Sequence, residues 1–349
     1  MNAKAWRFRN IVSFMVYKRA AWILLLTFII AAIIVILNVG MGDMFIPPAH
    51  VIDVLLGGGT KMEALVVKSF RLPRILMALL AGACLGMAGA ILQGIIRNPL
   101  ASPDIIGLSK GAAVGVVAFL TLFSNENNAL TVSIVWLPLA AFIGAVIAAF
   151  LVYILAWSKG VSPIRLVLVG IGISALMHAF VTMFLILAPI YRAGQANIWI
   201  TGTIHGTNWD EVSIITPIMI VLTILSIAAA RSINIQELGD DIATSVGSRV
   251  QQTRLWLLIL STALTGVAVA FVGAIGFVGL VAPHISRRLV GGAFGALLPM
   301  SALVGGIIVM LADLIGRTMF SPLEVPAGVF TAAIGAPYFI YLLFKGRHA

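Results

Sequence analysis

The sequence predicts an all-α protein whose helices cross a membrane many times. Two observations carry this prediction. Of the 349 residues, 61% are hydrophobic and 10% are charged, whereas about 25% charged residues is usual for a soluble protein. The apolar residues also form long continuous runs, which favour spanning helices over the alternating strands of a membrane β-barrel. The chain has too few charges to cover a water-soluble surface, so we expect a single polytopic transmembrane domain over residues 1–349.

Ten apolar runs account for most of the chain. A straight helix needs about 20 apolar residues to cross the hydrocarbon core, and all runs except the eighth approach or exceed that length. The eighth is too short and holds Gly276, Gly279 and Pro283, which predicts a broken or partly re-entrant helix beside an enclosed cavity. The expected spans are residues 20–39, 74–96, 105–123, 133–156, 163–188, 211–230, 255–273, 274–287, 297–316 and 327–344.

Residues 1–19 precede the first span and mix cations with aromatic residues, among them Lys4, Trp6 and Arg7. This mixture predicts a short interfacial helix on the cytoplasmic membrane surface. The next apolar run is too long for a signal peptide and no small-x-small cleavage site follows it, so we expect an uncleaved first span.

The distribution of cations predicts the orientation. Most of the 22 lysines and arginines, Lys110 among them, fall in segments that this order of spans places inside the cell, which agrees with the positive-inside rule. Both termini are then cytoplasmic. The net charge of +10 is therefore interpreted as membrane topology, and no nucleic acid partner is expected. Cys84 is the single cysteine, which excludes an intrachain disulfide and a cysteine metal cluster.

Residues 231–254 form the most polar stretch and are expected inside the cell. Gly239 and Gly247 should divide the stretch into short helices. Four apolar residues at successive i+4 steps predict one apolar stripe: Leu238, Ile242, Val246 and Val250. Such an element could lie on lipid headgroups, but its acidic residues would be repelled by an anionic leaflet, which favours a protein partner. These acids are Glu237, Asp240 and Asp241.

Cations at the outer end oppose the general trend. Arg71 and Arg74 bracket Leu72 and Pro73 at the outer start of the second span, and Arg317 ends the ninth. Guanidinium groups at an outward mouth suit bidentate binding of carboxylates on a ligand or a docking protein. The alternative is that these arginines reach the membrane interface as many span-end arginines do.

Several chemistries are absent from the sequence. There is no GxxxxGK[ST] motif, because the run Gly57 to Lys61 has the wrong order; if ATP drives transport, another subunit binds it. Carboxylates are nearly absent from the spans, and His178 is the one mid-membrane ionisable candidate, which argues against ion coupling. A histidine at such a position is more often a hydrogen-bonded packing residue, although the fifth span could still line a pathway. No residue spacing indicates a metal site or a hydrolytic triad.

Motifs over residues 65–345 resemble the permease subunits of ABC importers for iron siderophores, haem and cobalamin. The first part of the resemblance is Arg71-Leu72-Pro73-Arg74, Gly89-Ala90 with Gln93, and Asn98-Pro99-Leu100-Ala101 with Pro103, Gly107, Gly111 and Gly115. The second part is Trp199, Gly202, Trp209, Leu238-Gly239, GAIGFVGLVAPH from Gly273 to His284, Ala312-Asp313, Arg317, Glu324-Val325-Pro326-Ala327-Gly328 and Gly335-Ala336-Pro337.

The resemblance implies a fold like that of the cobalamin importer permease, in a bacterial cell membrane. Partners would be a second permease subunit (an identical copy or a related chain), two cytoplasmic ATPase subunits that hold ATP and Mg²⁺, and an extracellular or periplasmic substrate-binding protein. This chain would hold no cofactor of its own and no metal, and would not be an enzyme.

The resemblance also implies roles for particular residues. Arg71, Arg74 and Arg317 would dock the binding protein. Residues 231–254 would be the coupling loop that seats in the ATPase, with its contacts at Glu237, Leu238, Gly239, Asp240, Asp241 and Ile242. The translocation pathway and its gate would involve Lys159, Ser162, Pro163 and His178.

The cargo is open between iron(III)-siderophore complexes, haem and cobalamin. Siderophores are preferred because they are the commonest cargo of such permeases. An ion-coupled secondary transporter and a passive channel are more distant alternatives.

Overall fold

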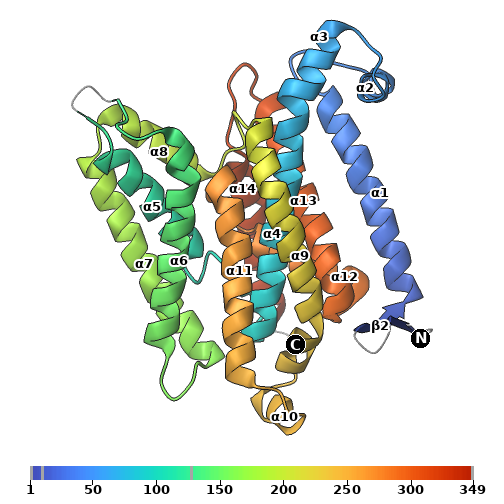
Figure 1. Ribbon diagram of the computed structural model, residues 1–349, viewed down its shortest axis with the longest axis vertical. Coiled ribbons are helices and arrows are strands. Elements are labelled where there is room, and N and C mark those ends of the chain that lie inside the picture. Colours follow the sequence, from blue (N-terminus) through green and yellow to red (C-terminus); the bar gives the residue numbers. More distant parts are fainter. Residues whose placement is uncertain (1–2, 9–11, 126–128, 347–349) are drawn as a thin grey trace.

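The computed structural model describes the chain except residues 1–2, 9–11, 126–128 and 347–349. Helices make up most of the described structure (Figure 1). In chain order they are α1 (Lys18–Gly40), α2 (Pro48–Leu55), α3 (Lys61–Ala64), the π-helix Leu65–Arg71, α4 (Leu72–Ile96), α5 (Leu108–Leu122), a 3₁₀-helix at Ile134–Trp136, α6 (Leu137–Ala156), α7 (Pro163–Leu187), α8 (Ile190–Thr201), α9 (Trp209–Glu237), α10 (Asp240–Ser245), α11 (Val250–Val272), α12 (Val278–Val290), α13 (Phe294–Thr318) and α14 (Ala327–Gly346).

The predicted all-α membrane bundle is confirmed, because each of the ten expected spans overlaps a helix. Within the described residues, seven helices are long and apolar enough to cross a membrane on their own. The apolar helices α5 and α14 are shorter by that measure, and α12 has 13 residues. The sequence did not predict α2, α3 and α8, which lie between the spans.

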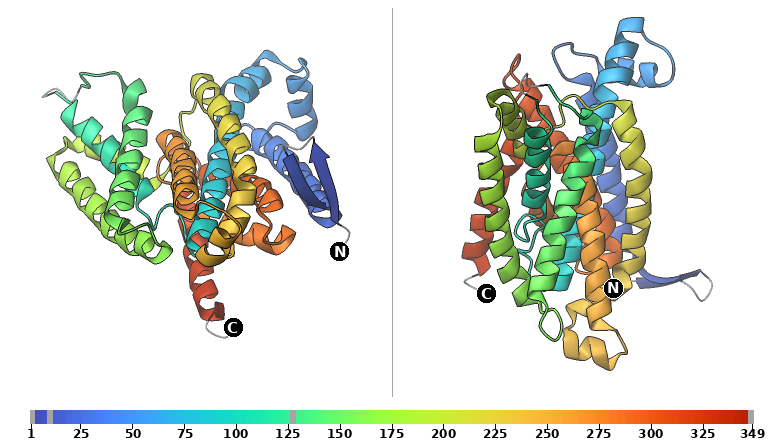
Figure 2. Two further views of the ribbon diagram at one scale, coloured as in Figure 1. Left: turned by 60° about the horizontal axis from the view of Figure 1, so that its bottom comes forward. Right: turned by 60° about the vertical axis from the view of Figure 1, so that its left-hand side comes forward.

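The N-terminal segment is a β-hairpin, in contrast to the interfacial helix expected there. β1 (Ala3–Phe8) pairs antiparallel with β2 (Val12–Tyr17), with Ala3 opposite Tyr17 and Phe8 opposite Val12. The β-branched and aromatic residues of β2 favour extended backbone, which explains the difference. Figure 2 shows the hairpin projecting from the start of α1, and its place at the cytoplasmic membrane surface stays a prediction.

α4 lies in the centre of the bundle and packs against α9, α11, α12 and α13 (Figure 1). Two of its glycines allow backbones to touch. A Cβ at Gly86 would lie 2.1 Å from the carbonyl oxygen of Ser301, and one at Gly89 would lie 1.7 Å from that of Gly279. No larger side chain fits at either position, so close helix packing requires both glycines.

α5 begins at half the depth of the bundle. After α4, the connection 97–107 climbs back into the bundle before α5 starts (Figure 1). A Cβ at Gly111, in the first turn of α5, would meet the Cβ of Ala148 and the carbonyl oxygen of Gly144, near the middle of α6. Lys110 therefore lies near the middle of the bundle. The expectation that Lys110 belongs to the inner cations was wrong. Residues 97–107 reach the middle of the bundle without forming a helix, so α5 starts there and not at the inner end.

α12 also begins inside the bundle, which confirms the broken eighth crossing. Residues 273–277 are non-helical, and Phe277, just before α12, has a positive φ of 65°. The 13 residues of α12 extend over about 20 Å, less than the hydrocarbon core. Asp104 links the starts of the two short helices: its carboxylate accepts from the Ser109 hydroxyl at 2.6 Å and from the Phe277 N–H at 3.3 Å.

The connections between the long helices lie at two opposite ends of the bundle. α2, α3 and residues 319–326 lie at one end, and α10 and the turn 157–161 lie at the other (Figures 1 and 2). Following the predicted orientation, we call the first the outer end and the second the inner end.

Candidate functional site

The outer end carries a group of charged side chains that we call the outer cluster: Arg71, Arg74, Asp313, Arg317 and Glu324. Arg74, in the first turn of α4, donates to the buried carboxylate of Asp313 from Nε at 3.0 Å and from Nη2 at 2.8 Å. Its Nη1 donates to Glu324 at 3.1 Å. The bidentate geometry gives this pair strength and fixed orientation. Arg74 is therefore held by two acids of its own chain.

The other two outer arginines hold the segment that follows α1. Arg71 donates to the carbonyl oxygens of Val39 and Met44 at 2.8 and 2.6 Å, and Arg317 donates to that of Met41 at 2.9 Å. Both side chains are buried. The structure brings together the three arginines that the sequence placed at the outer mouth, and their docking role stays a prediction.

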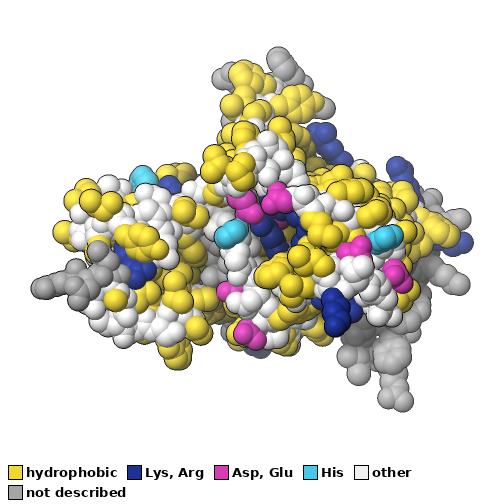
Figure 3. Space-filling model, turned by 90° about the horizontal axis from the view of Figure 1, so that it is seen from above, with side chains coloured by type: hydrophobic (Ala, Val, Ile, Leu, Met, Phe, Trp, Pro, Cys, Tyr) yellow, Lys and Arg dark blue, Asp and Glu magenta, His cyan; other side chains and the backbone are white. Residues whose placement is uncertain are grey.

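A cavity of about 490 Å³ opens beside the outer cluster. Its wall includes Arg74, Trp199, His205 and Glu324, and Figure 3 shows a hollow in the outer face with basic, acidic and histidine side chains around it. Burial raises the pKa of Glu324, but its bonds to Arg74 and His205 outweigh that effect and hold the pKa below its ordinary value. Sequence reasoning missed His205, whose Nδ1 lies 2.7 Å from Glu324 Oε2, because no local pattern signals a contact between residues so far apart in the chain.

At the inner end, α10 forms a projection between α9 and α11 (Figure 1). Gly239 and Gly247 bound it with positive φ angles of 110° and 81°. The two glycines therefore divide the stretch as predicted, but only α10 is a short helix, because the flanking parts belong to the long helices α9 and α11. Ala243 is buried, whereas Asp241 is exposed. The projection thus has one side against the bundle and one side free.

The predicted apolar stripe is mostly uncovered at this projection. Leu238, Ile242 and Val246 are 60%, 51% and 62% exposed. Val250, the fourth member, is buried at the start of α11. Exposed apolar side chains on a polar projection beyond the spans are typical of a protein interface.

Behind α10, Asp240 connects three parts of the chain, a contact set that we call the inner junction. The Asp240 carboxylate accepts from Arg97, directly after α4, and from Arg254 of α11, the latter at 2.8 Å. The buried Arg254 also donates to the carbonyl oxygen of Val161, in the turn before α7. Glu237 is bonded separately, to Arg287 at 2.8 Å. Sequence reasoning singled out both acids but not their cationic partners.

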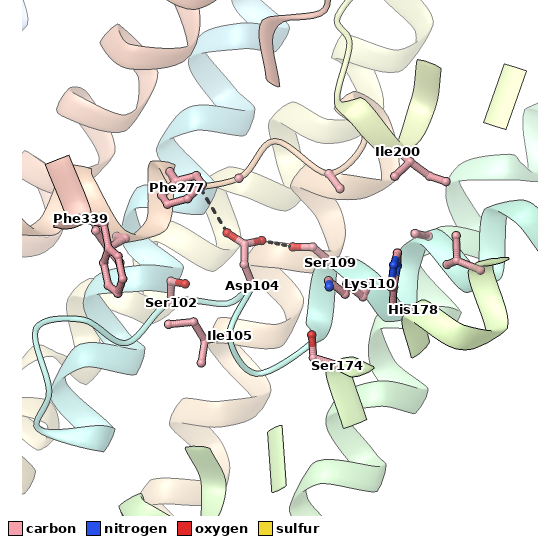
Figure 4. A pocket seen from close by; sticks show the side chains of 15 residues that line it. Ser102, Asp104, Ile105, Ser109, Lys110, Ser174, His178, Ile200, Phe277 and Phe339 are labelled. Atoms are coloured by element: carbon pink, nitrogen blue, oxygen red, sulfur yellow. Dashed lines mark hydrogen bonds between the residues drawn. The ribbon is translucent and has the colours of Figure 1, made fainter. Parts of the chain in front are cut away.

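A second cavity, of about 540 Å³, lies at mid-depth between α5, α7, α14 and the start of α12 (Figure 4). It combines apolar walls with polar and ionisable side chains. The polar and ionisable residues are Ser102, Asp104, Ser109, Lys110, Ser174 and His178. Phe277 and Phe339 form part of its apolar wall. We call it the central cavity.

Three of the four residues predicted for the pathway and its gate lie away from this cavity, and His178 lines it. Lys159 has a positive φ of 55° in the turn before α7, Ser162 accepts from the Arg165 N–H at 3.3 Å, and Pro163 is the first residue of α7. His178 comes 15 residues after Pro163 on the same helix, which is roughly 22 Å along the axis. The structure therefore places the candidate gate at the inner end and His178 at the middle.

The described part of the chain contains no group of three or more His, Cys, Asp or Glu residues placed to hold a metal ion. Cys84 is buried within α4. The sites that the geometry offers are therefore two end surfaces and a central cavity, an arrangement that suits a membrane transport subunit.

A family model described as the FecCD transport family matches residues 24–345. The chain belongs to this family, and it is a multi-pass membrane transport subunit of the permease kind.

Curated relatives and a solved structure extend this assignment. The chain is 55% identical to the "probable siderophore transport system permease protein YfhA" of Bacillus subtilis, over 95% of this chain and 97% of that protein. It is 42% identical to the "cobalamin import system permease protein BtuC" of Halobacterium salinarum, over 82% and 75%. A metal-chelate type ABC transporter solved in an inward-facing conformation superposes with a TM-score of 0.82 at 28% identity, covering 93% of this chain and 99% of that chain.

Proposed function

We propose that this chain is the permease subunit of an ATP-driven ABC importer that moves iron(III)-siderophore complexes into the cytoplasm. The observation that carries the proposal is the 55% identity, over nearly the full length of both chains, to a relative named for siderophore transport. The FecCD family membership and the ABC transporter fold support it.

The assembly that we propose contains a second permease subunit, two ATPase subunits and an external binding protein. The sequence holds no phosphate-binding loop, so ATP and Mg²⁺ would bind to the ATPase subunits, and this chain would need no cofactor. It would lie in a bacterial cell membrane with both termini in the cytoplasm, the orientation that its cations favour.

The ATPase would bind at the α10 projection. Leu238 and Ile242 offer exposed apolar area, and Glu237, Gly239, Asp240 and Asp241 surround it. Since the inner junction bonds Asp240 to Arg254, and Arg254 to the turn before α7, a displacement of α10 would be transmitted to Lys159, Ser162 and Pro163. This route gives ATP hydrolysis a mechanical connection to helix α7, which carries His178 into the central cavity.

The binding protein would dock at the outer end on Arg71, Arg74 and Arg317. Each of these arginines is already hydrogen-bonded within the chain, so a partner's carboxylate would add to these bonds or exchange with Glu324. An Arg74→Gln variant should weaken binding-protein affinity in nanodiscs by more than tenfold. The matched control is Lys68→Gln, an exposed outer cation, and equal affinity losses in both variants would contradict the docking role.

The decisive experiment is reconstitution of the chain with its ATPase, second permease and binding protein. Uptake of radioactive iron should require ATP and the binding protein. A panel of ferric hydroxamate, ferric catecholate, ferric citrate, haem and cobalamin identifies the cargo. Uptake driven by an ion gradient without the ATPase would instead establish a secondary transporter, and conductance by this chain alone would establish a channel.

Cobalamin is the second candidate cargo, because the chain is 42% identical to a relative named as a cobalamin import permease. Haem shares the same architecture. ATP-dependent uptake of either one, without uptake of any ferric chelate, would replace the siderophore proposal and leave the importer architecture intact.

A further inference from the structure

Lys110 has an unusual place in a membrane protein. It lies in the first turn of α5, one residue before the glycine that packs against the middle of α6. Its side chain is exposed and lines the central cavity (Figure 4). Among the described residues, Lys110 forms no ion pair within 4.0 Å.

A lysine at this depth is costly wherever it meets lipid. Placing lysine at the centre of a spanning helix costs roughly 2.5–3.5 kcal/mol on insertion scales, and such residues normally face a water-filled route or a partner charge. The packing of Gly111 against Gly144 and Ala148 places Lys110 near the middle of the bundle, where a lysine side chain would not reach either end. We therefore infer that the side of the bundle on which the Lys110 ammonium is exposed faces a water-filled or polar pathway and not lipid.

Asp104 lines the same cavity, and its charge acts on Lys110. No ion pair within 4.0 Å joins the two side chains, and the Asp104 carboxylate accepts hydrogen bonds from Ser109 and from the backbone of Phe277. Asp104 thus ties the starts of α5 and α12 together. Lys110 remains available to a negatively charged group that enters the cavity.

Two further side chains face the same space from α7. His178 is exposed and Ser174 half-buried, and both line the cavity wall. They add hydrogen-bonding groups beside the cation, while Phe277 and Phe339 supply an apolar wall. A cation, hydroxyl and imidazole groups and aromatic rings in one cavity suit a chelate with carboxylate or catecholate oxygens.

We propose that Lys110, assisted by His178 and Ser174, forms a mid-membrane binding station that favours negatively charged iron(III) chelates over neutral ones. The proposal rests on the proposed import function and adds to it a cargo class and a residue that selects for it. Iron(III) held by several carboxylates or catecholates carries net negative charge, whereas a ferric trihydroxamate is neutral. The attraction is stronger than in bulk water because much of the cavity wall is apolar, which lowers the effective dielectric constant around the ammonium. A single cation with few hydrogen bonds still lets the cargo leave, as transport requires.

The first test measures the charge selectivity of the cavity without any cargo. A His178→Cys variant places a reactive thiol beside Lys110, and Cys84 adds no background because it is buried. The measured quantity is the ratio of the reaction rate with an anionic methanethiosulfonate reagent to the rate with a cationic one, in nanodiscs that hold the full complex. This ratio should be higher for the thiol at position 178 than for a free thiol in solution. Adding Lys110→Met should lower that ratio about three- to tenfold, and Lys110→Arg should preserve it.

The control thiol for this test is Leu176→Cys. Leu176 is 45% exposed on the same helix, but it does not line the central cavity, and its thiol should react slowly with both charged reagents. Two results would overturn the proposal: a thiol at position 178 that neither reagent reaches, or a reagent ratio that Lys110→Met leaves unchanged.

The second test measures cargo selection by uptake. Ferric citrate and a neutral ferric trihydroxamate are each supplied with a binding protein that accepts them. Lys110→Met should reduce maximal uptake of the anionic chelate at least about tenfold and that of the neutral chelate less than twofold, with binding-protein affinity unchanged. Equal losses for both chelates would show a structural role and overturn the selection. If the wild-type complex imports no ferric chelate, the proposed cargo fails, while the reagent ratio still decides whether the cavity prefers anions.

Discussion

Both ends of the bundle bind charged residues within the chain, but the predicted contact surface at the inner end also turns apolar side chains outward. In the outer cluster, Arg71, Arg74 and Arg317 are directed into the chain, where carboxylates and carbonyl oxygens of the same protein bind them. At the inner end, the charge of Asp240 is also used internally, but the apolar side chains of Leu238 and Ile242 are turned outward.

The comparison teaches which signals mark a contact surface. A cation at a span end can serve a partner or its own fold, and the sequence does not distinguish the two uses. An apolar residue that lies beyond the spans and is still exposed has no such internal use, because uncovered apolar area is unfavourable in water. By this measure both ends offer contact surface, because Leu56 and Met62 at the outer end are also 83% and 61% exposed. The outer arginines, in addition, have a structural task within the chain.

The largest effect is expected from breaking the outer cluster. Asp313→Ala removes a carboxylate that is 3% exposed and leaves the Arg74 guanidinium without its bidentate partner. Loss of one member of a buried pair costs about 3–5 kcal/mol, which should appear as a large decrease in the melting temperature of the purified complex. The double variant Asp313→Leu with Arg74→Leu should recover much of that stability, and a double variant as unstable as the single one would contradict the pairing.

The second largest effect is expected on ATPase binding at the inner surface, without loss of stability of the permease. Leu238→Asp with Ile242→Asp replaces exposed apolar side chains, each worth about 1.5–3 kcal/mol when buried in an interface. ATPase affinity should fall more than tenfold and substrate-stimulated ATP hydrolysis should be uncoupled from transport, with the melting temperature unchanged. Thr244→Asp, also on α10 and exposed, is the control. Wild-type affinity and stimulated hydrolysis in the double variant would argue against this interface.

A smaller effect is expected from weakening the inner junction, and it should distinguish transmission through the junction from ATPase binding at the exposed stripe. Asp240→Asn weakens the bonds to Arg97 and to the buried Arg254, at a cost of about 1–3 kcal/mol. The ATPase should still bind, but fewer cargo molecules should be imported per ATP. Asp241→Asn, the neighbouring exposed acid, should leave this ratio unchanged, so equal ratios in the two variants would contradict a transmission role for Asp240.

The smallest effect concerns the exposed side of the outer cluster. The pKa of Glu324 lies below its ordinary value of 4.5 in the folded protein, so its bonds stabilise the fold above that value and are lost as the pH falls through the lowered pKa. Because the side chain is 37% exposed, solvent screening limits the gain to less than about 1 kcal/mol. The melting temperature of the wild type should exceed that of Glu324→Gln at neutral pH, and the difference should shrink in acid. A difference in melting temperature that stays constant across pH would contradict a stabilising role for the ionised Glu324 carboxylate.

Much of the fold could be predicted because a membrane-spanning helix requires a continuous run of apolar residues. Continuous apolar runs locate the helices, and Gly276, Gly279 and Pro283 marked the broken helix near its true place. The N-terminal hairpin was missed because cations and aromatic residues at an interface are compatible with either a helix or strands. The sites were only partly predictable: Asp240 and Arg74 stood out as polar residues in an apolar chain, whereas Arg254 and His205 depend on contacts between distant segments.

By itself, the sequence determined that the chain is a membrane bundle, where its spanning helices fall and which loop offers a polar projection. These features follow from local composition, because lipid requires apolar runs and internally bonded backbone. Only the tertiary structure decided which charges are already paired and how deep each residue lies. Lys110 shows the difference: its sequence neighbours suggest the inner surface, but α5 begins half-way through the bundle. Helix packing alone brings the ammonium to the central cavity.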